Sequence, residues 1–340
     1  MKKTIGRIFA MIGITLGMIV VFLYCVMFVL AKGPSKQARD LFVLSVRETS
    51  IGGFLANLYC SKAEIADIEE QNRVNSIDAD VDTSLIVIDK ELINKEHDKI
   101  YEDVPDENGV IYGDGLEFHP VSGPTYSGTM VVVYDPSRVF VGVSSPRYDG
   151  SPGLSIGDMC EKYEATLAVN AGGFYDYGGV GNGGDPVGIV ISEGEVRNGD
   201  MNTKYDLIGF DSNDILILGR MTPKEALERG IRDAVWWGPM LIVNGVPADV
   251  GGTGGGLNPR TAIGQRADGA VLLLVIDGRQ THSLGASISD LIKIFLEFDA
   301  VNAGNLDGGG STILYYKGEV LNKPSSVYGA RALPNGIIVR

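Results

Sequence analysis

Two aspartates open glycine-rich segments that follow apolar runs, a context in which a carboxylate can do chemistry. Asp277 comes directly after the apolar run Val271–Ile276, and Asp307 precedes three glycines and Ser311. Glycines leave backbone N–H groups free to close around a ligand oxygen, and a neighbouring hydroxyl can add a hydrogen bond. A carboxylate placed there can act as a nucleophile or as a general base. The alternative for Asp307 is a tight turn in which its side chain binds its own backbone.

Two arginines in small or polar surroundings could hold an anion next to these carboxylates. Arg260 follows Pro259, and Arg279 comes two residues after Asp277. A guanidinium presents forked donors that suit a phosphate or a carboxylate. Either side chain could instead form an ion pair with one of the 43 acidic residues. Arg331 is a weaker third candidate for anion binding.

A strand, a helix and a second strand must bring the two aspartates together. Val271–Ile276 is typical of a strand buried on both faces, a helix is predicted over Ile288–Phe298, and a strand is expected near Ala300–Ala303. Such a crossover predicts two parallel strands side by side, which end at the same edge of a sheet. Asp277 and Asp307 should therefore meet outside that edge, where open α/β sheets bind ligands.

Further patterns predict the elements around this unit. If Ala165–Val169 joins the same sheet, the segment that begins at Asn170 reaches the same edge. The runs Thr129–Tyr134 and Val139–Val143 suggest a hairpin. The expected fold class is α/β with mixed α+β content: a central mixed sheet with crossover helices, preceded by a transmembrane helix and a helical stalk. Capping residues predict helix starts at Ser61, Ser155, Thr222 and Ser287.

The N-terminus predicts a membrane anchor. The run Ile8–Ala31 contains no charged residue, and as a helix at 1.5 Å per residue it would span roughly 36 Å, enough to cross a bilayer. A signal peptide has an apolar centre of only about 7–15 residues, so a retained anchor is favoured over a cleaved signal. Three basic residues before the run favour a cytoplasmic N-terminus and an extracytoplasmic globular part, although three more just after it weaken that asymmetry.

The chain is therefore divided into five predicted segments. The stalk acts either as a spacer or as a surface for dimerisation or a partner. The segments are a cytoplasmic N-terminus (1–7), a transmembrane anchor (8–31), a helical stalk (32–77), an acidic connector with little packing (78–114) and the globular domain (115–340).

Composition excludes one class of partner. The formal net charge is −14, and the first 31 residues contain no acid, so the remainder is more negative still. Such a surface repels polyanions, which argues against nucleic-acid binding. Glycine clusters at Gly178–Gly184 and Gly251–Gly256 fit neither a Walker loop nor a dinucleotide fingerprint, so no cofactor is expected. They read as surface loops or as a lid, and acidic loops could supply oxygen ligands for a divalent cation.

Several motifs together resemble the phosphodiester glycosidase family, over roughly Gly115 to Arg340. One element is ambiguous: Trp236-Trp237 could be a sugar-stacking platform or core packing. The resemblance rests on Asn170-Ala171-Gly172-Gly173-Phe174, Pro186-Val187-Gly188, Pro259-Arg260-Thr261-Ala262-Ile263-Gly264, Asp277-Gly278-Arg279 and Asn305-Leu306-Asp307-Gly308-Gly309-Gly310-Ser311-Thr312.

The resemblance implies hydrolysis, outside the cytoplasm, of the bond between a sugar's anomeric carbon and a phosphodiester oxygen in a cell-wall or exopolysaccharide glycan. Asp307 or Asp277 would be nucleophile or base, and Arg260 with Arg279 would hold the phosphate. The family commonly has Glu-Arg before its last strand, whereas Ala330-Arg331 stands here, so a contact near the sugar or a supporting ion pair is in question. The predicted substrate-binding set is completed by Asn170, Gly172, Gly173, Asn305, Gly308, Gly309, Ser311 and Arg331.

Two other classes of function are compatible with the same residues. A non-catalytic relative could bind an anionic glycan during exopolysaccharide biosynthesis or export. A phosphodiesterase would cleave at phosphorus and release a sugar phosphate rather than free sugar. The joint presence of both aspartates and both arginines favours the glycosidase.

Overall fold

Three β-sheets form the body of the protein within the part of the chain that the computed structural model describes, residues 2–49, 52–75, 77, 79–97, 105–176, 181–326 and 329–340. Every strand pairing in them is antiparallel. The first sheet has the order β1 (Ile111–Gly113), β2 (Leu116–Ser122), β3 (Ser127–Val133), β14 (Val271–Ile276), β13 (Arg260–Arg266), β15 (Ala300–Asn305), β11 (Met240–Val243), β12 (Val246–Pro247).

Two five-stranded sheets complete the β-structure, and helices surround it. The second sheet has the order β7 (Glu195–Asn198), β6 (Val190–Ser192), β10 (Ile231–Trp236), β8 (Tyr205–Asp211), β9 (Leu216–Met221), and the third β17 (Glu319–Val320), β16 (Leu314–Tyr316), β5 (Leu167–Asn170), β18 (Asn335–Val339), β4 (Val139–Val143). The described helices are α1 (Lys2–Lys32), α2 (Lys36–Arg47), α3 (Phe54–Tyr59), α4 (Lys62–Gln71), α5 (Lys90–His97), α6 (Ile156–Lys162), α7 (Pro223–Glu228) and α8 (Ile288–Glu297), with short 3₁₀ turns η1 (Thr83–Leu85), η2 (Pro136–Arg138) and η3 (Gly309–Ser311).

The α+β class is confirmed, but the central sheet is antiparallel rather than mixed. The predicted strand–helix–strand unit exists as β14, α8 and β15, yet its two strands are not neighbours. β13 lies between them and pairs antiparallel with both. β14 and β15 therefore run in the same direction, and the prediction that they lie side by side is wrong because β13 already occupies the position next to β14.

Two further strand arrangements differ from the expected ones, because the strands pair with other partners. The runs predicted as a hairpin become β3 and β4, which belong to different sheets. β5 joins the third sheet, between β16 and β18, and not the central one. The turn η2 lies between the two strands as expected, but a turn does not determine which strand the following residues pair with. The four predicted helix starts are confirmed, with capping boxes at Ser61, Thr222 and Ser287.

The central sheet is buried on both faces because side chains alternate along each strand. In β14, Leu273 and Val275 face the core shared with the other two sheets, while Leu272 and Leu274 face α8. Phe295 of α8 is fully buried against that second face. The uninterrupted apolar run of β14 therefore comes from cover on both sides.

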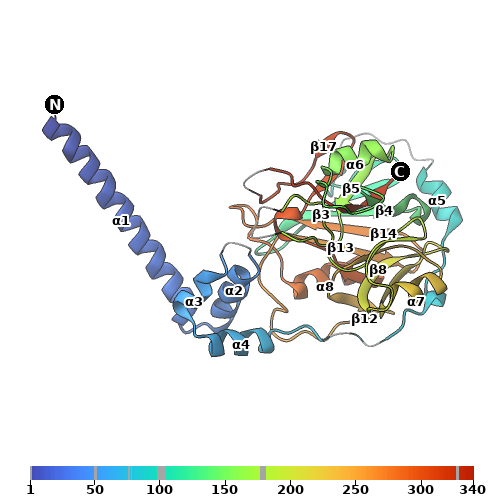
Figure 1. The fold of residues 1–340 in the computed structure, drawn as a ribbon, viewed down its shortest axis with the longest axis horizontal. Coiled ribbons are helices and arrows are strands. Elements are labelled where there is room, and N and C mark those ends of the chain that lie inside the picture. Colours follow the sequence, from blue (N-terminus) through green and yellow to red (C-terminus); the bar gives the residue numbers. More distant parts are fainter. Residues whose placement is uncertain are drawn as a thin grey trace.

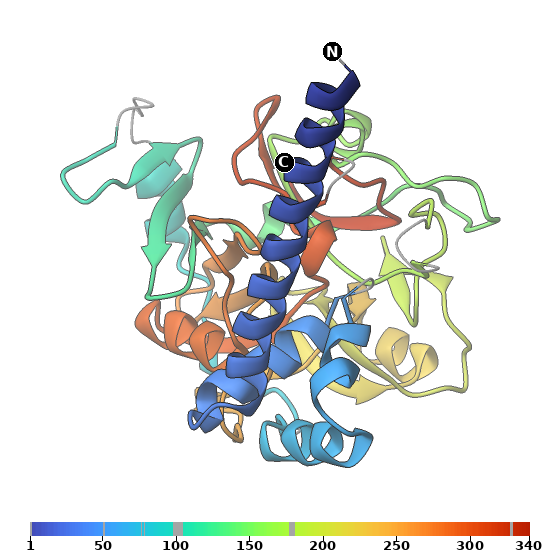
Figure 2. The ribbon, with the colours of Figure 1, turned by 90° about the vertical axis from the view of Figure 1, so that its left-hand side faces the viewer.

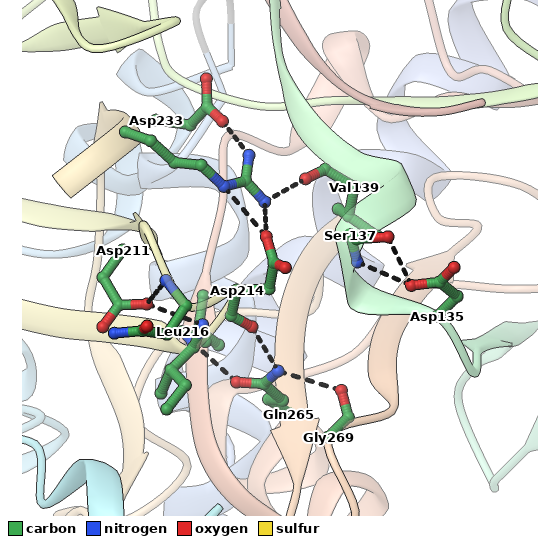
Figure 3. Close-up of polar contacts among 12 residues, drawn as sticks. Asp135, Ser137, Val139, Asp211, Asp214, Leu216, Asp233, Gln265 and Gly269 are labelled. Carbon is green, nitrogen blue, oxygen red and sulfur yellow. Dashed lines mark hydrogen bonds and ion pairs between the residues drawn. The ribbon is translucent and has the colours of Figure 1, made fainter. Parts of the chain in front are cut away.

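A polar network joins the sheets within this core (Figure 3). The Arg232 guanidinium donates to the backbone oxygen of Val139 in β4 at 2.8 Å, and it forms ion pairs with Asp214 and Asp233. Gln265 of β13 accepts a 2.6 Å hydrogen bond from the Leu216 N–H of β9 and donates to the backbone oxygen of Asp214 at 2.9 Å. Buried polar groups need partners, so these contacts fix how the layers sit on one another.

α1 projects away from the sheets, with α2, α3 and α4 between it and the body (Figure 1). It is long and apolar enough to cross a membrane, with a mean hydropathy of 2.7 and only 6% of the most apolar window buried. The predicted connector packs more than expected: Val81 and Ile86 are buried in the main core, and the 3₁₀ turn η1 lies between them. Its residues 78 and 98–104 lie outside the described residues, as do residues 178–180 of the first glycine cluster.

Candidate active site

Three chain segments converge at one end of the central sheet. Arg260 at the start of β13 lies opposite Ile276 at the end of β14, and Ala262 lies opposite Asn305 at the end of β15. The segment entering β13 and the segments leaving β14 and β15 therefore meet. A cavity of about 340 Å³ opens there. It is lined by Glu48, Phe174, Asp176, Trp237, Asn258, Arg260, Arg279, Asn305, Leu306, Asp307, Gly308, Gly309, Gly310, Ser311 and Arg331.

Asp307 lies in the wall of this cavity, held by its own backbone. Its N–H donates to the Ala171 oxygen at 2.9 Å, and its backbone oxygen accepts from the Asn170 amide at 2.5 Å. Burial raises the pKa of the Asp307 carboxyl to about 6, although hydrogen bonds from the Ser311 hydroxyl and the Gly308 N–H act in the opposite direction. A carboxyl with this pKa is ionised near neutral pH but desolvated, the state expected of a nucleophile or base.

The glycines after Asp307 allow two chain segments to approach closely. A Cβ on Gly308 would lie 2.7 Å from the Pro259 oxygen, and Gly309 adopts a φ of +60°. The Gly309 N–H donates to the same Pro259 oxygen at 2.9 Å. Because the turn carries no side chains, the Arg279 guanidinium can lie next to it, 3.4 Å from where a Gly309 Cβ would stand.

The two predicted arginines share the same wall of the cavity. The Arg279 Nη2 donates to the Asn258 Oδ1 at 2.8 Å. Arg260 donates to the backbone oxygens of Ala286 and Gly256, at 3.2 and 2.9 Å, and forms a 2.9 Å ion pair with Glu48. Burial lowers the pKa of Arg279, and the charge of Arg260 contributes in the same direction. Two neighbouring guanidiniums that disfavour each other create a position where an anion is stabilised.

Asp277 does not line the cavity, contrary to the prediction that it faces Asp307 there. Its carboxylate contacts the His282 ring at 2.9 Å and accepts hydrogen bonds from the Asn322 amide and the Lys323 N–H, at 3.2 and 2.9 Å. The Asp277 carboxylate therefore holds the segment around residue 322 against the end of β14. The reason for the difference is local: the backbone turns directly after β14, so the side chain points to a neighbouring loop.

Asn170 and Gly172 support the cavity wall through hydrogen bonds with neighbouring segments. The Asn170 side chain accepts from the Thr261 hydroxyl at 2.6 Å and, as described above, donates to the Asp307 backbone. The Gly172 N–H donates to the Asn335 side chain at 2.7 Å. Asn170, Gly172 and Gly173 do not line the cavity. Asn305 does line it, and its side-chain amide donates to the Gly238 backbone oxygen at 2.9 Å.

Gly173 makes room for an aromatic wall. A Cβ at this position would lie 1.9 Å from the Trp237 ring, so only glycine fits. Trp237 lines the cavity, whereas Trp236 packs against the main core. Trp236 therefore has the core-packing role that the sequence left open, and Trp237 lies at the cavity, where the sugar-stacking alternative stays a prediction.

We therefore expect Gly173→Ala to displace Trp237 and destabilise the fold by about 1–3 kcal/mol, the usual cost of overpacking. The melting temperature measures this loss. Gly219→Ala is the matched control, because its nearest neighbour is the flexible Met221 Cε at 3.0 Å. Equal stability of the two variants would contradict the role assigned to Gly173.

Arg331 has a carboxylate partner from another part of the chain. It forms an ion pair with Asp176, and its guanidinium lies 4.7 Å from the centre of the Phe174 ring. Arg331 thus has an ion pair with Asp176, although the glutamate that commonly precedes this arginine is absent. Sequence analysis did not single out Asp176, although it lies only two residues beyond the Asn170–Phe174 motif.

Glu48 is the lining residue that sequence reasoning had no means to find. It follows α2 in the predicted stalk, 212 residues before Arg260. Besides its ion pair, its carboxylate accepts from the Gly256 N–H and the Asn258 amide, each at 2.7 Å. The second glycine cluster, Gly251–Gly256, is therefore a contact surface for the stalk. Among the residues that the structure describes, no group of three or more His, Cys, Asp or Glu side chains could hold a metal ion.

The cavity contains the carboxylate and the arginines expected of a phosphodiester glycosidase, and comparison with known families gives the same class. The chain belongs to the phosphodiester glycosidase family, whose model matches residues 163–340, just over half of the chain. This confirms the resemblance based on the motifs.

Individual relatives are distant. The prophage-derived protein YomE of Bacillus subtilis is 26% identical over 206 residues, covering 56% of this chain and 29% of its own length. The mouse N-acetylglucosamine-1-phosphodiester alpha-N-acetylglucosaminidase is 25% identical over 229 residues, covering 60% and 42%. The chain thus matches less than half the length of these relatives. The zebrafish enzyme's catalytic domain, a structure auto-inhibited by its pro-peptide, has a TM-score of 0.55 at 18% identity, covering 78% of this chain and 96% of its own. That likeness concerns the fold.

Proposed function

We propose that this protein is a membrane-anchored, extracytoplasmic glycosidase that hydrolyses the bond between a sugar's anomeric carbon and a phosphodiester oxygen. The observation that carries the proposal is the cavity, whose lining includes both Asp307, with a pKa near 6, and the guanidiniums of Arg260 and Arg279. Membership of the phosphodiester glycosidase family supports the reaction class. The apolar helix α1 supports the anchor.

Asp307 is the best candidate for the catalytic carboxylate. The other two carboxylates in the cavity wall, Glu48 and Asp176, form ion pairs with Arg260 and Arg331. Asp307 instead accepts hydrogen bonds from neutral donors, so its charge remains available to the anomeric carbon. It either attacks that carbon or removes a proton from the attacking water. Asp277, which was a second candidate for nucleophile or base, lies outside the cavity and takes a positioning role in this scheme instead.

The arginines replace the acid that an ordinary glycosidase needs. As the bond from the anomeric carbon to oxygen breaks, its electron pair leaves with the phosphate, which is a weak base and requires little protonation. Arg279 and Arg260 stabilise the added charge on that phosphate. Trp237 would pack against the sugar ring, and Ser311 and Asn305 would orient hydroxyl groups.

A product assay tests the proposal. The purified full chain in detergent is expected to release free sugar from a synthetic sugar 1-phosphodiester. Binding without release would favour the glycan-binding alternative, and release of sugar phosphate would favour cleavage at phosphorus.

The pKa of Asp307 predicts the acid limb of the pH–rate profile. Activity requires the ionised carboxylate, so kcat/KM should fall about tenfold per pH unit below a pKa near 6. The Ser311 hydrogen bond lowers this pKa, so Ser311→Ala should move the limb to higher pH. A profile that is flat from pH 4 to 8, or a limb that Ser311→Ala leaves in place, would contradict the assignment.

A further inference from the structure

Helices α2, α3 and α4 form one unit with the C-terminal part of α1, and we call them the membrane-proximal unit. Ala31 of α1 is fully buried among Val43 and Leu44 of α2 and Ala56 of α3. The unit is therefore packed onto the predicted anchor and is not a loose tether.

One helix of the unit lies alongside the apolar part of α1. The rings of Tyr24 and Tyr59 are 5.3 Å apart, and the Tyr59 hydroxyl donates to the Tyr24 backbone oxygen at 3.4 Å. Tyr24 precedes the end of α1 by eight residues, about 12 Å of helix. On the same short helix, Phe54 and Leu58 are 60% and 57% exposed, four residues apart and so on one face. Tyrosines at this depth and exposed apolar side chains beside them are typical of the membrane–water interface.

The same unit also forms part of the cavity wall. Glu48 directly follows α2 and lines the cavity, and the Ser45 hydroxyl accepts from the Leu257 N–H at 2.8 Å. Gly256 lies so close to α2 that a Cβ there would be 2.3 Å from the Ser45 nitrogen. Phe54 lies six positions after Glu48, a length of chain that reaches about 22 Å when fully extended. The cavity is thus held within that distance of the interfacial residue.

The orientation of the body agrees with this placement. η3, whose residues line the cavity, is the short orange-red turn on the side of the sheets that faces α1 (Figure 1). Seen from the α1 side, the same turn is in front of the sheets (Figure 2). With α1 across a bilayer, the part of the cavity wall formed by η3 would lie on the side of the body that is nearer the lipid surface.

We infer that the substrate is a sugar 1-phosphodiester whose second ester is to a lipid alcohol of the same membrane that holds α1. The inference rests on the proposed function and adds where the aglycone lies. The lipid would remain in the bilayer while its phosphate reaches Arg260 and Arg279. A soluble diester would have the same reacting atoms, but its hydrolysis would gain nothing from a fixed distance between the cavity and the membrane.

Two substrates with one sugar test this inference. The full chain is reconstituted in liposomes with N-acetylglucosamine 1-phosphate esterified either to a long polyprenol or to methanol. The polyprenol ester should be hydrolysed with a kcat/KM at least tenfold higher, based on total lipid-substrate concentration. Equal or faster hydrolysis of the methyl ester would overturn the inference and leave the proposed function standing. Hydrolysis of neither ester would reject both.

A spacer between Gly33 and Pro34 separates geometry from simple enrichment of substrate in the bilayer. A helical insertion of 20 residues, about 30 Å long, should lower the rate on the polyprenol ester at least tenfold and leave the methyl ester rate within twofold. A flexible Gly/Ser insertion of the same length is the matched control, because it lets the body return to the surface, and a smaller loss is expected. An unchanged polyprenol rate in the helical variant would contradict the inference.

Discussion

Asp307→Asn should abolish turnover, with kcat reduced by at least about 10³-fold, since a general base contributes about 10²- to 10⁴-fold and a nucleophile contributes more. The amide has nearly the same shape and can still accept hydrogen bonds from the Ser311 hydroxyl and the Gly308 N–H. It can neither attack the anomeric carbon nor take a proton from water. Steady-state kinetics on a synthetic sugar 1-phosphodiester measures the loss.

Stability separates this effect from unfolding. Burial raises the folded-state pKa of Asp307 above its unfolded value, so the folded protein binds the proton more tightly. The ionised carboxylate therefore costs stability above pH 6, and this cost disappears as the pH falls below about 4. Asp307→Asn should accordingly melt at the same temperature as the wild type, or higher, at pH 7. Asp206→Asn, an exposed aspartate on β8, is the control that should keep full activity.

Arg279→Lys is expected to have the second largest effect, a fall in kcat/KM of about 10²- to 10³-fold, comparable to removing one charge-stabilising donor from an active site. A lysine keeps the charge but presents no fork, and it cannot donate to Asn258 and the phosphate in one plane. The loss should appear mainly in kcat, because the charge on the phosphate increases as the bond breaks.

Arg220→Lys is the matched control for that variant. Its side chain on β9 is 70% exposed and lies outside the cavity. Activity of Arg279→Lys within threefold of the Arg220→Lys value would remove Arg279 from the proposed phosphate site.

The sequence predicted local features well because they depend on neighbouring residues. The capping serines and threonine define the starts of α4, α6, α7 and α8, and the apolar run of β14 follows from cover on both faces. The convergence of Arg260, Arg279 and Asp307 was also predicted, although from a strand arrangement that proved wrong in one detail. β14 and β15 end at the same edge whether or not β13 lies between them.

Long-range pairing and side-chain direction were not predictable in the same way. Nothing local to β3 or β4 specifies that they enter different sheets, because partner choice depends on the whole core. Asp277 lies at the correct edge but points to Asn322 and Lys323, which a single backbone turn decides. Glu48 reaches the site through tertiary packing of α2, so no motif spacing could reveal it.

The position of the broken bond tests the central claim most directly. The full chain is incubated with a sugar 1-phosphodiester in water enriched in oxygen-18, and both products are examined by mass spectrometry. Attack at the anomeric carbon predicts that the label enters the sugar hydroxyl and that the phosphate product contains none. Label in the phosphate, with none in the sugar, would mean cleavage at phosphorus and would contradict the glycosidase mechanism.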